Sequence, residues 1–444
     1  MNLTRAAGLL LVTTATVIGF SLGACGSDGE KGETGATGAP GAAGPAGPAG
    51  PAGPAGDGTG DGGIVTGALG GACTTPCHTF NGVVDQWRFS NHSHPQENEI
   101  GGGVCGNCHG IDGLAQRTAG VYSVAPDAGV ATDVNKGHIN FRTVSGSTSE
   151  INYGGATTIG KIHCSTCHAF SSTNDPHVTG KYLAGQAPIR VAGGVNDYAV
   201  LEKSDAGSTT ALGTQLQYRR ANVCVFCHKS RKDVTFYITN ANTMSSSRWG
   251  PHEGPVTDVY SGKGGYHFAG MTYGSSAHVT DPRMGDACVT CHMRPVAENS
   301  NVPDHTMKPT VAFCKSCHTA YQGADFDIQG GRTLVRKALT ELQTALNDRG
   351  LITRAEVAPY SALEADEIGD GQFHLDKSRP GSGPGGANQV LDAPTAGALY
   401  NYFILARSKD IGVHNPTYEK QLLWDSIKQI KGGDPTSMPG GRPQ

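Results

Sequence analysis

Residues 288–292 read Cys-Val-Thr-Cys-His, and residues 314–318 read Cys-Lys-Ser-Cys-His. In both stretches a histidine directly follows the second of two closely spaced cysteines. The same arrangement recurs towards the N-terminus, where the copy at Cys73 has one extra residue between its cysteines. Twelve of the 13 cysteines fall into six such motifs. The motifs are Cys73/Cys77/His78, Cys105/Cys108/His109, Cys164/Cys167/His168, Cys224/Cys227/His228, Cys288/Cys291/His292 and Cys314/Cys317/His318.

This spacing is typical of covalent heme c attachment. The two cysteines form thioethers with the macrocycle, and the histidine that follows binds the iron from the proximal side. Paired cysteines in an exported chain also build disulfide frameworks or zinc sites. Neither alternative explains why every pair carries a trailing histidine. The sequence therefore predicts six covalent hemes c, held by twelve attachment cysteines and six proximal histidines.

The second axial ligand decides what each iron can do. Eleven of the 17 histidines remain after the six proximal ones, which is enough to close every iron with a second imidazole. Irons closed in this way are suited to electron transfer. For each candidate the alternative is an ordinary surface or hydrogen-bonded histidine. The distal candidates are His92, His138, His163, His278, His305 and His414, with His177 and His252 in reserve, whereas His94, His267 and His374 are expected to be exposed or structural.

The composition of the chain does not favour an ordinary side-chain core. Of 444 residues, 37% are apolar and 7% aromatic, and 65 are glycine. Because little apolar surface is available to offset the ordering of the chain, we expect the porphyrins to fill the core. The predicted fold is a multiheme cytochrome fold, loop-rich and mainly α with little sheet. A net charge of −4 with interspersed signs indicates no nucleic-acid partner.

The N-terminus indicates export and a lipid anchor. Arg5 precedes an apolar stretch over residues 6–20, and Leu22-Gly23-Ala24-Cys25 resembles the lipobox of bacterial lipoproteins. Residues 1–24 are then a signal peptide and Cys25 is the acylated residue. The alternative is an ordinary signal peptide with an incidental cysteine. Gly26 after the acylated cysteine favours the outer membrane over the inner one, so we expect an exported, cell-surface lipoprotein.

A collagen-like repeat follows the anchor. Glycine occupies every third position from Gly26 to Gly56, with four Gly-Pro-Ala units starting at Gly44. Only glycine fits the axis of a collagen triple helix, so this pattern predicts either a homotrimer or a single-chain, semi-rigid spacer. With the glycine-rich joint that follows, residues 25–62 are predicted to be a stalk.

The rest of the chain divides into three parts. Residues 63–330 are predicted to bind the six hemes. Residues 331–432 are predicted to be helical, because Leu334 to Leu346 recur at helical spacing before Gly350, and residues 396–408 and 418–430 suggest two more helices. Residues 433–444 are expected to be a disordered tail.

Two stretches resemble known families. Residues 276–318, with Ala277-His278, Cys288 to Met293, Asp304-His305 and Cys314 to His318, resemble the multiheme superfamily of ammonia-forming nitrite reductases and hydroxylamine oxidoreductases. Ile411 to Pro416, at the start of the last helix, is similar too. The resemblance covers about the last third of the chain, and it implies that His278, His305 and His414 are distal ligands.

One departure from that superfamily bears on activity. The nitrite reductases carry a C-x-x-C-K motif at the catalytic heme, whereas all six motifs here end in histidine. The middle of the chain, around Gly137-His138-Ile139-Asn140 and Ile162 to His168, looks like the outer-surface multiheme cytochromes of metal-reducing bacteria. That match is shorter and less specific.

Three classes of function follow. The first is electron transfer through six hemes to an extracellular acceptor, such as a metal oxide or another cytochrome. The second is a multiheme oxidoreductase for a small nitrogen or sulfur compound, with one open iron and His252, Tyr266 or His267 as proton donors. The third is a structural role in trimers or filaments. The first is the preferred hypothesis.

Overall fold

The computed structural model describes fourteen stretches of the chain. These are residues 82–93, 105–110, 112–119, 140–144, 147–150, 162–171, 187–191, 198–201, 214–238, 242–243, 249–252, 254–295, 302–352 and 390–444. The signal peptide, Cys25, the collagen-like repeat and the motif Cys73/Cys77/His78 lie outside these stretches, as do His138 and His177.

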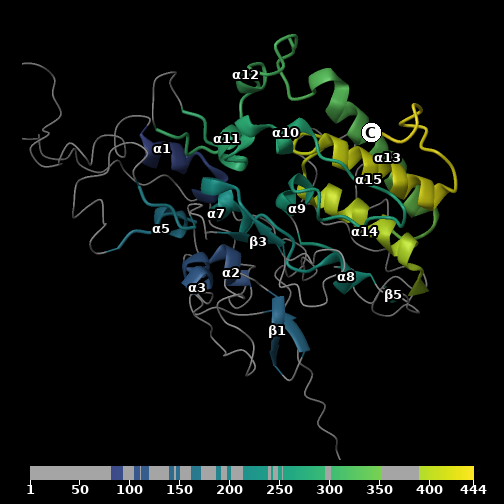
Figure 1. Ribbon diagram of the computed structural model, residues 1–444, viewed down its shortest axis with the longest axis horizontal. Coiled ribbons are helices and arrows are strands. Elements are labelled where there is room, and N and C mark those ends of the chain that lie inside the picture. Colours follow the sequence, from purple (N-terminus) through teal and green to yellow (C-terminus); the bar gives the residue numbers. More distant parts are fainter. Residues whose placement is uncertain are drawn as a thin grey trace, which may run out of the picture.

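Three long helices at the C-terminal end form the largest packed unit (Figure 1). They are α13 (Gly331–Asp348), α14 (Ala393–Ser408) and α15 (Pro416–Lys431). α15 packs against both of the others. The periodic leucines of α13 face the shared core, where Leu339, Leu342 and Leu346 are fully buried. The three helices expected from the sequence are therefore confirmed.

Local sequence signals fix the ends of these helices. The Asp392 carboxylate caps α14 by accepting a hydrogen bond from the Thr395 amide at 2.7 Å. Pro416 opens α15, where a missing amide proton costs nothing. Gly432 ends α15 in the left-handed conformation with φ of 74°, which glycine adopts without strain.

The C-terminal tail is ordered, so the expectation of a disordered tail is wrong. Met438 is buried against the helix core. Arg442 forms an ion pair with Asp425 of α15 at 2.8 Å and donates to the Thr272 carbonyl. The tail is glycine-rich and polar in sequence, but Met438 packs against the helix core and Arg442 pairs with the buried Asp425.

The remaining described elements are short. Helices are mostly single turns, and the strands form two-stranded antiparallel sheets that pair β1 with β2, β3 with β4 and β5 with β6. The described part of the chain is thus mainly α with little sheet, as expected. The helices are α1 (Val83–Arg88), η2 (Asn91–Ser93), α2 (Gly106–His109), α3 (Gly113–Ala119), α5 (Cys164–Cys167), η4 (Arg219–Ala221), α7 (Asn222–Val225), α8 (Val234–Tyr237), α9 (Val256–Tyr260), α10 (Ala277–Thr280), η5 (Pro282–Met284), α11 (Cys288–His292), α12 (Val311–Cys314) and η6 (Ile328–Gly330). The strands are β1 (Asn140–Val144), β2 (Ser147–Glu150), β3 (Ala199–Leu201), β4 (Thr214–Leu216), β5 (Asn242–Thr243) and β6 (Val390–Leu391).

Side-chain packing differs between the two ends of the molecule. The long helices share one large apolar cluster, whereas the short helices around α7 have only small clusters, such as the one that joins Leu114, Leu201 and Phe226. The expectation of a core poor in apolar side chains is therefore wrong for the C-terminal helices. For the region of the motifs it stays a prediction. Within the described residues, no helix combines the length and hydropathy needed to cross a membrane.

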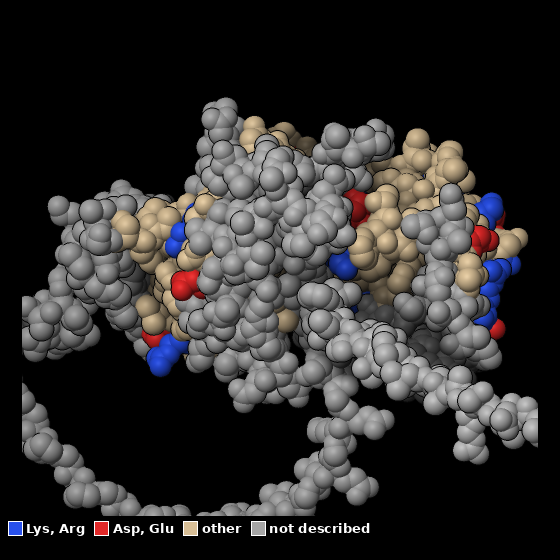
Figure 2. Space-filling model, turned by 90° about the horizontal axis from the view of Figure 1, so that it is seen from below, with Lys and Arg blue, Asp and Glu red and all other residues tan. Residues whose placement is uncertain are grey.

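Charged side chains of both signs are interspersed on the described surface. On the face drawn in Figure 2, blue and red side chains neighbour one another at both ends of the molecule.

Candidate heme-binding sites

Each described motif folds around one helical turn. The amide of the motif histidine donates to the carbonyl of the first cysteine in three of them, at 2.8 Å for His168, 3.0 Å for His228 and 2.9 Å for His318. Residues at positions i, i+3 and i+4 lie on the same side of a helix. The spacing of the motif therefore brings both cysteines and the histidine to one face.

The five described motif histidines each face a second histidine. The ring centres are separated by 5.9–6.4 Å. Within each pair the partner comes from a distant part of the chain or from another element. The pairs are His109–His252 at 6.4 Å, His168–His305 at 6.3 Å, His228–His92 at 5.9 Å, His292–His414 at 6.0 Å and His318–His278 at 5.9 Å.

These separations fit one iron between the two rings. Two imidazoles bound on opposite faces of an iron have ring centres roughly 6 Å apart, since each metal–nitrogen bond is about 2 Å long and the ring centre lies about 1 Å beyond the nitrogen. Direct stacking of two imidazoles would bring their centres closer. The residues present therefore fit a heme at each of the five sites.

Burial keeps most of these imidazoles neutral, which is the form that binds a metal. It lowers the pKa of His228 to about 4. It also lowers the pKa of six others, which are His92, His109, His168, His292, His305 and His318.

His414 departs from this trend. Burial pulls its pKa down, but the charge of Asp410 and the contact with that carboxylate outweigh burial, so the pKa of His414 is raised. Asp410 lies in the turn before α15, and its carboxylate is 2.9 Å from His414 Nδ1.

Neighbouring motifs touch through their cysteines. The thiols of Cys108 and Cys227 hydrogen-bond to each other, and so do those of Cys224 and Cys288. The buried Arg117 reinforces the first contact, because its guanidinium donates to the carbonyls of Asn107 at 3.0 Å and Phe226 at 2.8 Å. The motif on α7 therefore lies between those on α2 and α11, as Figure 1 shows.

The described cysteines are thiols, with one exception. Nine are free, and Cys105 is disulfide-bonded. A thioether forms only from a thiol, so the Cys105 disulfide has to be reduced before heme attachment at this motif.

The structure brings most of the expected distal candidates to a motif histidine. His92, His278, His305 and His414 are each paired in this way. His252, considered only as a reserve, is paired with His109.

His163 faces no motif histidine among the described residues. Its Nδ1 caps α5 by accepting from the Ser165 amide at 3.3 Å. The segment that carries it also touches α1, where Trp87 Nε1 donates to the Ile162 carbonyl at 3.0 Å. Its expected role as a distal ligand is therefore not tested by the five pairs.

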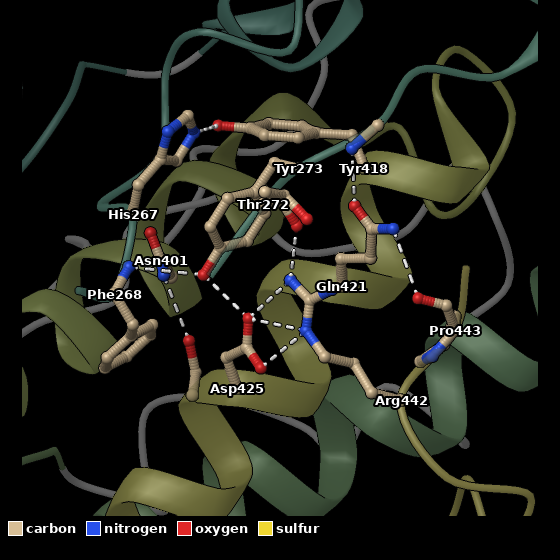
Figure 3. Close-up of polar contacts among 12 residues, drawn as sticks. His267, Phe268, Thr272, Tyr273, Asn401, Tyr418, Gln421, Asp425, Arg442 and Pro443 are labelled. Carbon is tan, nitrogen blue, oxygen red and sulfur yellow. Dashed lines mark hydrogen bonds and ion pairs between the residues drawn. The ribbon is translucent and has the colours of Figure 1, made fainter. Parts of the chain in front are cut away.

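The proton donors considered for an enzyme do not meet at one site. His252 faces His109. Figure 3 shows His267 in a polar network at the surface of the long helices, where its Nε2 lies 2.8 Å from the Tyr418 hydroxyl and its ring stacks on Tyr273. Tyr266 packs closely over Gly397 of α14. His267 is therefore structural, as the sequence suggested.

Two residues next to the imidazoles were not singled out from the sequence. Asp410 was missed, although an acidic residue four positions before a candidate ligand was a visible signal. Met307 was missed because its role depends on a long-range contact, in which its sulfur lies 2.7 Å from His92 Nδ1. Among the described residues, no group of three or more His, Cys, Asp or Glu side chains is arranged to hold a separate metal ion.

The known proteins to which the chain is similar are polyheme cytochromes. The chain is 24% identical over 402 residues to the C-type polyheme cytochrome OmcB of two Geobacter sulfurreducens strains, which covers 84% of this chain and 50% of that protein. It is 25% identical over 273 residues to the C-type polyheme cytochrome OmcC of the same species, covering 56% of this chain and 35% of the relative. The chain resembles polyheme c-type cytochromes.

These similarities support a multiheme cytochrome with covalently bound heme c. The chain spans half or less of the length of these curated relatives. No family model matches it. No solved structure matches it either.

Proposed function

We propose that the chain is a hexaheme electron-transfer protein in which every iron is closed by two histidines. The observation that carries this proposal is the set of five histidine pairs at 5.9–6.4 Å. Heme c supplies a one-electron carrier at each motif, and two imidazoles leave no coordination position for a substrate. The proximal ligands are the six motif histidines, and the distal ligands of the five described motifs are their partners in these pairs.

The sixth heme belongs to Cys73, Cys77 and His78, and we assign its distal position to His163. Two observations support this choice. No described motif histidine faces His163, and its segment touches α1, which begins five residues after His78. His138 and His177 are the alternatives for this position.

The cysteine contacts suggest the order in which electrons pass. The motif on α7 touches the motif on α2 through Cys227 and Cys108, and the motif on α11 through Cys224 and Cys288. Because the thioether sulfurs mark the edges of the macrocycles, we infer that the α7 site is the central carrier. The α12 site, where Cys317 is exposed, lies at one end.

The N-terminal sequence supports a proposal for the cellular location of the protein. A lipid on Cys25 and the repeat from Gly26 to Gly56 would hold the hemes away from an outer membrane, on the cell surface. The partners would be other cytochromes or an extracellular acceptor such as a metal oxide. The stalk serves this role either as a spacer or as a trimer.

The test is the oxidation of the fully reduced protein by different acceptors. Rapid oxidation by a solid ferric oxide or by an oxidised multiheme cytochrome, without turnover of nitrite or hydroxylamine, is the expected result. Steady turnover of either small compound, with slow oxidation by the solid, would contradict the proposal and favour the oxidoreductase alternative.

A further inference from the structure

The Nδ1 atoms of the paired imidazoles have different neighbours. Where the described residues supply a close partner, it is uncharged in five cases and a carboxylate in one. The uncharged partners are the carbonyls of Pro188 for His168 at 3.1 Å, Met307 for His292 at 2.9 Å, Pro303 for His305 at 2.8 Å and Val413 for His278 at 2.6 Å, and the Met307 sulfur for His92 at 2.7 Å. The carboxylate is Asp410, 2.9 Å from His414 Nδ1.

The turn between α14 and α15 builds this contact. Asp410 Oδ1 accepts from the amides of Val413 at 2.9 Å and His414 at 2.8 Å. The side chain of Asp410 is fully buried. Gly412 makes the turn possible with φ of 79°, and a Cβ there would lie 2.8 Å from a methyl of Val335. The carboxylate is therefore held in place by backbone and packing, and its position does not depend on His414 alone.

A buried carboxylate at this position has two physical effects. It fixes the ring orientation and makes the imidazole a stronger donor to a metal bound at its other nitrogen. Its negative charge, poorly screened because it is buried, also favours the ferric iron over the ferrous iron, which carries one positive charge fewer. Both effects lower the midpoint potential of the site.

We propose that Asp410 is a positioning residue that orients His414 and lowers the potential of the His292–His414 heme. The inference rests on the proposed function, because it needs His414 as an axial ligand. It gives this site a buried carboxylate, whereas the Nδ1 partners printed for His168, His305, His92 and His278 are uncharged. A potential step within the chain would give electron flow a preferred direction.

The test is the variant Asp410→Asn, which keeps an oxygen for the two amides and removes the charge. Changes next to metal ligands typically alter metal sites about 10- to 100-fold. If the ratio of affinities for ferric and ferrous iron changes by the same factor, the midpoint potential shifts by about 60 to 120 mV, because a factor of ten corresponds to 59 mV for one electron. One of the reduction steps in a potentiometric titration followed by EPR should rise by this amount, and the others should stay in place.

The ring angles identify the step. The planes of His292 and His414 are 7° apart, so both rings interact with the same iron d orbital, and this site should give the most rhombic low-spin signal. The next smallest angle among the pairs is 25°, for His168 and His305. The control is Asp425→Asn, which removes another buried, ion-paired carboxylate that touches no paired histidine. The inference is overturned if the rhombic signal titrates as in the wild type, or if Asp425→Asn moves it equally.

If Asp410→Asn does not fold, the EPR signals of the wild-type protein provide a second test. Among its low-spin signals, one rhombic signal should show the stronger axial field of an imidazole paired with a carboxylate, and should titrate at low potential. A rhombic signal with an ordinary axial field and a high potential would refute the inference. If the hemes are missing or high-spin in the wild type, it is the proposed function that fails.

Discussion

We predict that His252 is the distal ligand of the iron that His109 binds. Its ring centre lies 6.4 Å from that of His109. The variant His252→Ala should open this one iron and leave the other five closed. About one-sixth of the ferric iron should then become high-spin, because loss of an axial nitrogen weakens the ligand field at that iron alone. The fold should survive, since the side chain is only half-buried.

The measurement is EPR of the oxidised variant, with the heme content determined on the same sample. Added imidazole should fill the open position and remove the high-spin signal. The matched control is His267→Ala, which removes a histidine that bonds to Tyr418 and faces no motif histidine among the described residues. The assignment is wrong if His252→Ala retains the wild-type spectrum, or if His267→Ala produces the same signal.

Three further predictions concern the fold and its pH dependence. The double variant Cys224→Ala/Cys227→Ala should lose one heme by mass spectrometry and melt at a lower temperature than the matching variant at the exposed α12 motif; equal melting would argue against a central α7 site. Leu342→Ala should lower the free energy of unfolding by about 2–5 kcal/mol in denaturant titrations, because the side chain is fully buried in the helix core. Burial alone would raise the pKa of Glu341, but the bonds of its carboxylate to Lys431 and to the tail outweigh burial and lower this pKa to about 2. The carboxylate therefore stabilises the fold above the ordinary carboxyl pKa, and this stabilisation is lost as pH falls towards 2. Glu341→Gln should make the free energy of unfolding less dependent on pH in this acidic range.

The attachment sites and the long helices could be predicted from the sequence because both depend on local spacing. The C-x-x-C-H pattern needs only one helical turn to bring its three functional side chains to one face. Likewise, the leucines of α13 recur with the period of a helix, and Leu339, Leu342 and Leu346 are fully buried. In these cases neighbours in the chain carry the whole signal.

The pairing of histidines could not be predicted, because it depends on contacts across long stretches of chain. His252 is brought to His109 by a loop that Arg407 of α14 holds, through a hydrogen bond from its Nη1 to the Pro251 carbonyl at 2.5 Å. Nothing near His252 in the sequence marks that contact. The ordered tail was missed for the same reason, since the partner of Arg442 is Asp425 on a neighbouring helix.

Closure of every iron by two histidines can be tested by EPR of the fully oxidised wild-type protein, with heme stoichiometry measured on the same sample. We expect six hemes per chain, all low-spin. We also expect a rhombic signal from the nearly parallel rings of His292 and His414, and a large-g signal from the pair His278–His318, whose planes are 86° apart. Fewer hemes, or a stoichiometric high-spin signal that shifts when nitrite or hydroxylamine is added, would contradict the closure of every iron by two histidines.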